Sequence, residues 1–192
     1  MKWLAALLVI GLATNTTAAT RTDIGGPFQL INQNGQRVTE RSFGQPALLY
    51  FGFMTCPAIC PTDLARMARI SRQLQQQQGI RVRPVFVTID PERDTPAKLK
   101  KYVNYFAKNF VGLTGSAQEI GRITDAYHVY YKKVPSGDKP GQYTMDHSTH
   151  LFLLDSEGRY LKHFGRGMDE KEIEKQVISA LADAPARLQD PQ

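Results

Sequence analysis

PALLYFGFMTCPAICP, residues 46–61, is the stretch of sequence that decides the fold. Its first half, Pro46 to Phe53, is a short apolar run without polar alternation, which predicts a strand buried on both faces. Cys56 and Cys60 follow this strand directly. Residues 63–77 then carry apolar or small side chains at a helical period, and a glycine ends the pattern. The two cysteines therefore lie between a core strand and the helix that follows it.

The flanking sequence completes an α/β pattern. Before the run, Asn34-Gly35 lies between two short extended segments and predicts an N-terminal β-hairpin. After it come a strand at 82–89, a helix at 95–110, an extended stretch at 111–115, a helix capped by Ser116, a polar loop at 143–148, strands at 149–154 and 160–164, and a helix from Asp169 to about Ala182. This order predicts a central mixed β-sheet flanked by helices. With a cysteine pair after the first core strand, it is typical of a thioredoxin-like fold.

Length and composition exclude several classes of protein. The chain has 192 residues, which suits one domain, and 42% are hydrophobic and 22% charged, which excludes disorder or coiled coil as a description of the whole chain. The net charge is +6, but no run of five or more Lys or Arg occurs, so we expect no nucleic-acid partner. The excess charge is interpreted as an aid to solubility or as steering toward an acidic partner.

The N-terminus has the pattern of an export signal. Residues 1–19 place Lys2 before the apolar run WLAALLVIGLA, which small residues follow up to Ala18 and Ala19. The apolar run is shorter than the roughly 20 residues that a spanning helix needs, so an uncleaved membrane anchor is the weaker alternative. We expect residues 1–19 to be removed, leaving an exported, periplasmic domain at 20–185 and a flexible tail at 186–192.

The spacing of the cysteines leaves several kinds of chemistry open. If Cys56 and Cys60 both lie in the first turn of a helix, they share a face, and the helix N-terminus is expected to lower the thiol pKa. Three residues separate them, whereas the usual dithiol redox motif has two. The longer spacing still permits a disulfide across one turn, or the binding of one metal ion by both sulfurs. A purely structural disulfide is less favoured, because such bridges usually close larger loops.

A nitrogen donor extends the range of metals that two thiolates can bind. Two soft thiolates suit Cu(I), whereas Cu(II) also favours nitrogen. His147 precedes the predicted strand at 149–154, which lies beside the cysteine loop in a thioredoxin-like sheet. Thioredoxins have a cis-proline in this region, and here the histidine occupies it instead. His150 is expected on the opposite face of the strand, and His128, His150 and His163 are all interpreted as ordinary packed or surface histidines.

On these residues the sequence resembles the SCO/SenC family of copper-binding cytochrome c oxidase assembly proteins, over residues 25–180. The matching segments are FGFMTCPAICP at 51–61, VTIDPERDTP at 87–96, VGLTG at 111–115, VYY at 129–131 and DHS at 146–148. The resemblance implies a thioredoxin-like fold in which Cys56, Cys60 and His147 bind a copper ion. The acidic residues of Asp90 to Thr95 have two interpretations, as support for the metal ligands or, the favoured one, as the start of a loop and a helix cap.

The resemblance predicts a metallochaperone rather than a classical enzyme. Its partner would be the copper-site subunit of cytochrome c oxidase, whose binuclear site receives the copper, or another exported copper protein. The alternative is a thiol–disulfide oxidoreductase with Cys56 and Cys60 as its catalytic dithiol. A redox or copper sensor is a third possibility, and structural zinc is disfavoured because it requires four ligands. We expect a monomer whose only membrane contact is through its partner or an uncleaved N-terminus.

Overall fold

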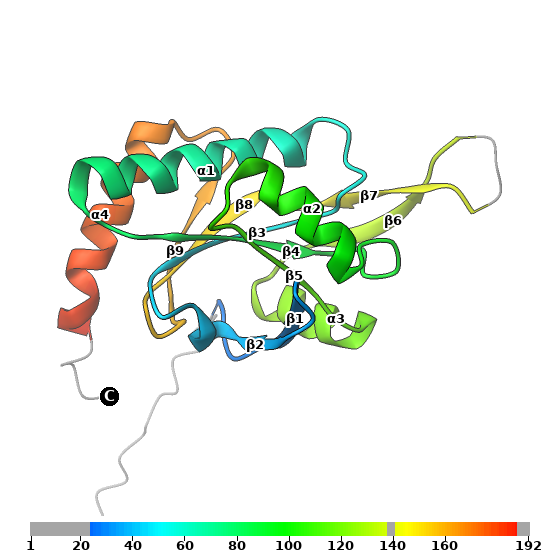
Figure 1. The fold of residues 1–192 in the computed structure, drawn as a ribbon, viewed down its shortest axis with the longest axis horizontal. Coiled ribbons are helices and arrows are strands. Elements are labelled where there is room, and N and C mark those ends of the chain that lie inside the picture. The colour runs from blue at the N-terminus through cyan, green and yellow to red at the C-terminus, as the bar shows by residue number, and fades with distance from the viewer. Residues whose placement is uncertain (1–23, 138–140, 188–192) are drawn as a thin grey trace, which may run out of the picture.

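The computed structural model describes residues 24–137 and 141–187. Within them, seven strands form a central sheet in the order β2-β1-β5-β4-β3-β8-β9. Their bounds are β1 (Gln29–Asn32), β2 (Arg37–Thr39), β3 (Ala47–Gly52), β4 (Arg83–Thr88), β5 (Val111–Thr114), β8 (His150–Leu154) and β9 (Tyr160–Gly165). β3, β4 and β5 run parallel, whereas β1 and β8 pair antiparallel with their neighbours. The predicted mixed sheet is confirmed (Figure 1).

Helices cover both faces of this sheet. α1 (Ile59–Gln78) and α2 (Pro96–Phe106) lie on one face, and α3 (Ala117–Ala126) lies on the other (Figure 1). α4 (Glu170–Arg187) packs beside α1 and β9, and a short 3-10 helix, η1 (Glu40–Phe43), follows β2. Within the described part of the chain, no helix is both long and apolar enough to cross a membrane.

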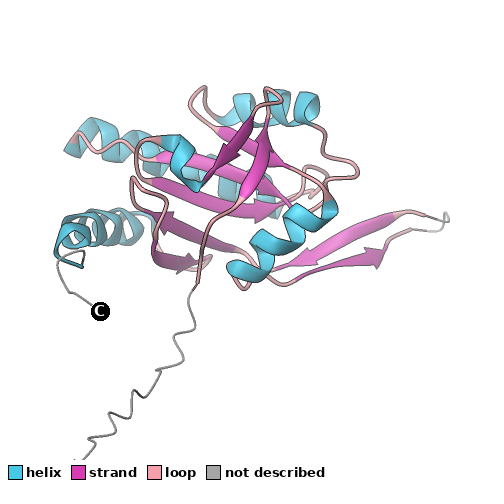
Figure 2. Cartoon of the chain, turned by 90° about the horizontal axis from the view of Figure 1, so that it is seen from below, coloured by secondary structure: helices cyan, strands magenta, loops and turns pink. Residues whose placement is uncertain are grey.

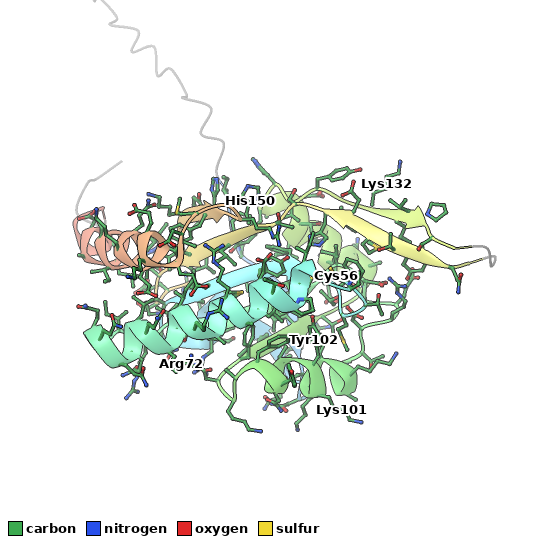
Figure 3. The ribbon with its side chains drawn as sticks, turned by 90° about the horizontal axis from the view of Figure 1, so that it is seen from above. Cys56, Arg72, Lys101, Tyr102, Lys132 and His150 are labelled. Atoms are coloured by element: carbon green, nitrogen blue, oxygen red, sulfur yellow. The ribbon has the colours of Figure 1, made fainter. Side chains whose placement is uncertain are left out.

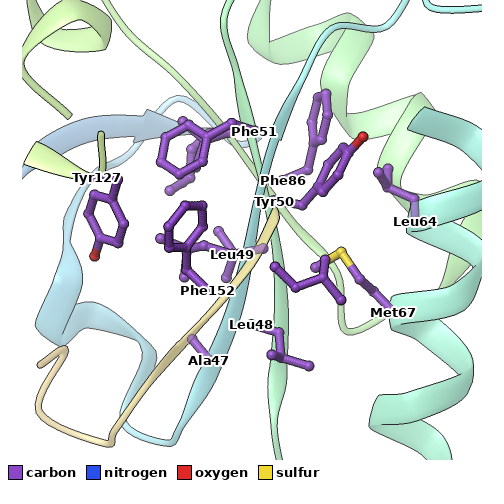
Figure 4. Packing of buried hydrophobic residues seen from close by; sticks show 14 of the residues in the cluster. Ala47, Leu48, Leu49, Tyr50, Phe51, Leu64, Met67, Phe86, Tyr127 and Phe152 are labelled. Atoms are coloured by element: carbon purple, nitrogen blue, oxygen red, sulfur yellow. The ribbon is translucent and has the colours of Figure 1, made fainter. Parts of the chain in front are cut away.

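β3 forms the centre of the core, and all six of its residues are buried. Successive side chains of a strand point to opposite faces, so this strand contributes to two apolar layers (Figure 4). On one face Tyr50 lies near Leu64 and Met67 of α1. On the other face Phe51 packs against Phe152 of β8, with ring centroids 5.7 Å apart. The apolar run needs no polar alternation because neither face of β3 meets water.

The predicted N-terminal hairpin is present as β1 and β2. Its turn contains Gly35 at φ 79, a backbone conformation that favours glycine. The side-chain oxygen of Asn32 accepts the backbone N–H groups of Asn34 and Gln36. The turn chemistry that predicted the hairpin therefore also holds it.

The expected polar loop at residues 143–148 is mostly a strand, so that expectation was wrong. β7 (Tyr143–His147) pairs antiparallel with β6 (Tyr131–Pro135). The two strands form a separate ribbon that projects from the body of the molecule (Figures 1 and 2). Most side chains of β6 are exposed, so no buried face imposes the apolar alternation by which strands are recognised in a sequence.

Several boundaries also differ from the sequence expectations. α1 begins four residues earlier than predicted, at Ile59, and α2 ends at Phe106 rather than near Phe110. α4 continues to Arg187, past the expected end near Ala182. The expected signal at 1–19 lies outside the described residues, as do residues 188–192 of the expected tail.

The capping box at the start of α3 is expected to contribute to the stability of the fold. The Ser116 hydroxyl accepts the N–H of Glu119, and the Glu119 carboxylate accepts the N–H of Ser116. We expect Ser116→Ala to lower the free energy of unfolding by about 1 kcal/mol, because one N–H group at the helix start loses its acceptor. Urea unfolding would measure this, with Ser156→Ala in an exposed turn as the control. Equal losses in the two variants would contradict the role of the cap.

Candidate metal centre

The cysteines lie where β3 passes into α1. Because α1 begins at Ile59, only Cys60 is in its first turn, and Cys56 precedes the helix in the connecting loop. The N–H of Cys56 donates to the carbonyl of Phe53 at 3.3 Å, and the N–H of Cys60 donates to Cys56 Sγ at 3.4 Å. Both cysteines are free thiols. The loop, rather than a shared helical turn, therefore brings the two cysteines together.

Gly52 allows this close packing of the loop. A Cβ at this position would lie 2.8 Å from Cys60 Sγ, 3.0 Å from a ring carbon of Tyr50 and 3.1 Å from a ring carbon of Phe86. Carbon atoms do not normally approach other heavy atoms so closely, so a side chain at this position would displace its neighbours. The last residue of β3 must be glycine for the Cys60 thiol to lie against the sheet.

Burial dominates the electrostatics of the Cys60 thiol. Cys60 is completely buried, and burial raises its pKa to about 12 because a thiolate would lose its hydration. The expectation that the helix N-terminus lowers its pKa was therefore wrong for Cys60. Cys56, near the start of α1 (Figure 3), is also buried, with 9% of its surface exposed.

Two tyrosine hydroxyls adjoin the thiols. The Tyr50 hydroxyl donates to Cys60 Sγ at 3.8 Å. The Tyr102 hydroxyl of α2 is buried without a hydrogen-bond partner among the described residues. Burial raises the pKa of Tyr102, and the nearby Cys60 and Cys56 raise it further. The Cys60 thiol thus has one neutral O–H group, that of Tyr50, as a donor, and the unpaired Tyr102 hydroxyl is a second buried polar group in the same region.

His147, the last residue of β7, reaches the same thiol. Its Nε2 lies 3.8 Å from Cys60 Sγ, and its Nδ1 lies 2.8 Å from the backbone carbonyl of Ser148. A carbonyl only accepts, so Nδ1 carries the proton and the lone pair of Nε2 faces the sulfur. Burial lowers the pKa of His147 and favours the neutral ring. The edges of the rings of Tyr50 and Phe53 pack against it, with centroids 6.3 and 5.8 Å away.

The loop after β4 supports the cysteine loop. One oxygen of Asp94, Oδ2, accepts the N–H of Met54 at 3.0 Å and the hydroxyl of Thr88 at 2.6 Å. Asp94 is 2% exposed, and burial is the main cause that raises its pKa. The favoured sequence interpretation of this segment, a loop start and a helix cap, omits its direct hydrogen bond to the cysteine loop, which fits the alternative of a supporting role.

The same loop supports the strand that carries His147. The Tyr143 hydroxyl, at the start of β7, donates to Asp90 at 2.8 Å. Arg93 pairs with Asp90 and donates to the Tyr143 carbonyl at 2.9 Å. Its guanidinium also lies 3.8 Å from the centroid of the Tyr143 ring. The segment from Asp90 to Asp94 therefore holds both parts of the centre, the cysteine loop and the histidine strand.

The structure places the other histidines away from this contact. His128 follows α3 at φ 52, and His150 and His163 lie on β8 and β9. No cis peptide bond occurs among the described residues, so a cis-proline does not line the cysteine loop. Across residues 24–137 and 141–187, no three or more His, Cys, Asp or Glu side chains are already gathered closely enough to hold a metal ion. Cys60 and His147 are in contact, and any third donor requires a side-chain rotation.

Sequence reasoning selected Cys56, Cys60 and His147 but missed the residues that position them. Two signals were available. One was the glycine that ends the apolar run just before the cysteines, and the other was the cluster of charges at 90–94 beside a predicted strand end. Tyr50, Tyr102 and Tyr143 gave no local signal, because their roles depend on contacts between distant segments.

Comparison with known proteins identifies the family of the chain. The SCO1/SenC family model matches residues 16–182. The SCO2-like protein of Rickettsia felis is 46% identical over 151 residues, which are 78% of this chain and 73% of that protein. Mitochondrial protein SCO1 of Saccharomyces cerevisiae is 38% identical over 169 residues, which are 86% of this chain and 57% of that protein.

Two solved structures are also similar. Arabidopsis thaliana ScoI with copper bound has a TM-score of 0.78 at 38% identity, covering 83% of this chain and 99% of that one. Yeast Sco1 with copper bound has a TM-score of 0.78 at 36% identity, covering 88% of this chain and 96% of that one. These similarities confirm the predicted thioredoxin-like fold.

The role of Gly52 is testable by adding one methyl group. We expect Gly52→Ala to lower the free energy of unfolding by about 1–3 kcal/mol, because the new Cβ overlaps Cys60, Tyr50 and Phe86. Gly121→Ala in α3 is the control, since nothing lies within 4 Å of its Cβ and alanine favours a helix. Urea unfolding measures both variants. A Gly52→Ala protein as stable as the parent would show that the cysteine loop accommodates a methyl group at this position without strain.

The contact of Asp94 with the cysteine loop is testable in the same way. We expect Asp94→Ala to cost about 2–3 kcal/mol of unfolding free energy, because it leaves the N–H of Met54 and the hydroxyl of Thr88 without an acceptor. Asp125→Ala, an exposed position on α3, should change stability by less than about 0.5 kcal/mol. Similar losses of unfolding free energy in the two variants would show that Asp94 does not stabilise the cysteine loop.

Proposed function

Because the chain belongs to the SCO1/SenC family, we propose that it is an exported copper chaperone that binds its cargo through Cys56, Cys60 and His147. The observation that carries the proposal is the contact between Cys60 Sγ and His147 Nε2 at 3.8 Å. It joins a soft sulfur and an available nitrogen lone pair on segments 87 residues apart in the sequence. The copper-bound structures of the Arabidopsis and yeast relatives support the choice of metal.

The donor set fits copper in both of its common oxidation states. Thiolate sulfur suits Cu(I), and imidazole nitrogen beside sulfur suits Cu(II). His147 is already oriented for this purpose, because its Nδ1–H donates to the Ser148 carbonyl and leaves Nε2 free. The hydroxyl of Tyr50 is placed to donate to the Cys60 sulfur, which becomes negative when the metal replaces its proton.

Loading requires a small rearrangement at Cys56. Its Sγ accepts the N–H of Cys60, whereas Cys60 Sγ contacts His147. A turn of the Cys56 side chain brings the second sulfur to the ion, and the thiol protons leave to solvent. Of the two thiols Cys56 is the less buried, at 9% exposure against 0% for Cys60, and Ile59, between them in the sequence, is exposed. We propose that an acceptor's ligands enter on this side and exchange with Cys56 first.

The acceptor is proposed to be the copper-site subunit of cytochrome c oxidase during its assembly, or another exported copper protein. The reaction is transfer of an ion between two sets of ligands, so no bond of an organic substrate is made or broken. The sequence pattern of residues 1–19, which is that expected of an export signal, supports a periplasmic location for the domain. A monomer is sufficient, since all three proposed ligands come from one chain.

His147→Ala distinguishes copper delivery from thiol–disulfide exchange. We expect Cu(II) binding to fall by more than about 100-fold, because a direct nitrogen ligand is lost. Cu(I) binding should fall less, since two thiolates can hold it alone, and reduction of a test disulfide should continue. The measurements are copper titrations of the reduced protein and a disulfide reduction assay, with His128→Asn, a residue tolerated at positive φ, as the control.

Cells that carry these variants report which activity is used. If the chaperone proposal holds, His147→Ala cells should fail to assemble cytochrome oxidase at low copper while the dithiol still reacts. Normal oxidase assembly with His147→Ala, together with loss of assembly in Cys60→Ala, would refute copper delivery and favour an oxidoreductase that uses Cys56 and Cys60.

A further inference from the structure

A second pair of metal-ligating side chains lies on the other face of the sheet. In the antiparallel pairing of β8 with β9, Phe152 is opposite His163 and His150 is opposite Gly165. His150, Phe152 and His163 therefore point to the same face, which Phe152 shares with Phe51. This is the face away from α1 and Cys60. The two imidazoles are exposed, and their ring centroids lie 5.5 Å apart.

The surroundings of the pair combine an apolar base with open space. The buried ring of Phe152 lies beneath both imidazoles, with centroids 6.2 Å from His150 and 5.9 Å from His163. Opposite His150, Gly165 has no side chain, and nothing lies within 4 Å of where its Cβ would be. The two imidazole rings thus pack on the buried Phe152 ring, while the space beside His150 is open to an ion and its water ligands.

Tyr160 orients one of the two rings. Its hydroxyl lies 2.6 Å from His163 Nδ1, and the two rings are stacked. When Nδ1 donates to the phenol oxygen, Nε2 of His163 keeps its lone pair, which is the arrangement found in metal-binding histidines. Partial burial and the neighbouring His150 and Lys162 lower the pKa of His163, so protons compete weakly for its nitrogens.

We propose that His150 and His163 form a second metal site, for a divalent cation of the Cu(II) class. Imidazole nitrogen suits Cu(II), Ni(II) and Zn(II), and among divalent first-row metals such ligands bind Cu(II) most tightly. Two protein nitrogens with water in the remaining positions make a site that exchanges its ion readily. Sequence reasoning interpreted both histidines as ordinary, because residues 13 positions apart give no sign that strand pairing brings them together.

This site is independent of the proposed dithiol centre. No thiol belongs to it, and it lies on the opposite face of the sheet. The two are nevertheless neighbours along the chain, because only Ser148 and Thr149 separate His147 from His150, a span of at most about 11 Å. The pair therefore holds Cu(II) at the surface within a short distance of the ligand strand, whether or not the dithiol centre binds copper.

The test is a Cu(II) titration of the full chain carrying Cys56→Ser, Cys60→Ser and His147→Ala, which silences the first centre. We expect this protein to bind one Cu(II) whose electron paramagnetic resonance spectrum shows coordinated imidazole nitrogen. Adding His150→Gln or His163→Gln should weaken binding by at least ~10-fold in each case. His128→Asn, the matched control on another part of the surface, should leave the affinity and the spectrum unchanged.

A second measurement avoids any change at the cysteines. In the otherwise intact chain, His150→Gln together with His163→Gln should lower the number of bound Cu(II) ions by one. The proposal is overturned if the silenced protein binds no Cu(II), or if only one of the two single substitutions weakens binding. It is also overturned if His128→Asn weakens binding as much as they do, because the ion is then held non-specifically.

Discussion

At Gly52 the end of β3 and the first turn of α1 meet with no side chain between them. This close approach determines the rest of the centre. It places Cys60 in the dry layer between sheet and helix, under the Tyr50 hydroxyl, and leaves Cys56 at the surface end of the loop. The two thiols of one short motif therefore differ in their surroundings: Cys60 has no exposed surface, whereas Cys56 keeps a small exposed fraction.

The cysteine loop and the strand that ends at His147 must stay aligned for the imidazole to face the Cys60 thiol, because the two residues are 87 positions apart in the sequence. The segment from Asp90 to Asp94 performs this alignment with hydrogen bonds in two directions. Asp94 holds the backbone of the cysteine loop, and Asp90 and Arg93 hold the first residue of the strand that ends at His147. Charged side chains of one loop thus bridge two segments that lie far apart in the sequence.

Sequence patterns predicted the features that depend on local rules. The buried strand follows from an uninterrupted apolar run, the first hairpin from Asn34-Gly35, and α3 from its capping serine. They could not predict the ribbon of β6 and β7, because no buried face imposes a periodicity on it. The contact between Cys60 and His147 was expected only by analogy with a fold in which a strand start lies beside the cysteine loop. The burial that raises the pKa of Cys60 depends on how the loop packs against sheet and helix, which no single sequence motif predicts.

The ribbon of β6 and β7 has a consequence for the behaviour of the protein in solution. Within the described residues each of its strands has one neighbour, so each also presents a free row of backbone donors and acceptors. Such edges can recruit a strand from another molecule and begin aggregation. β6 carries Lys132, Lys133 and Pro135, and two like charges together with a missing N–H group make that recruitment unfavourable. The basic composition of this arm therefore helps a projecting two-stranded element to remain soluble at high protein concentration.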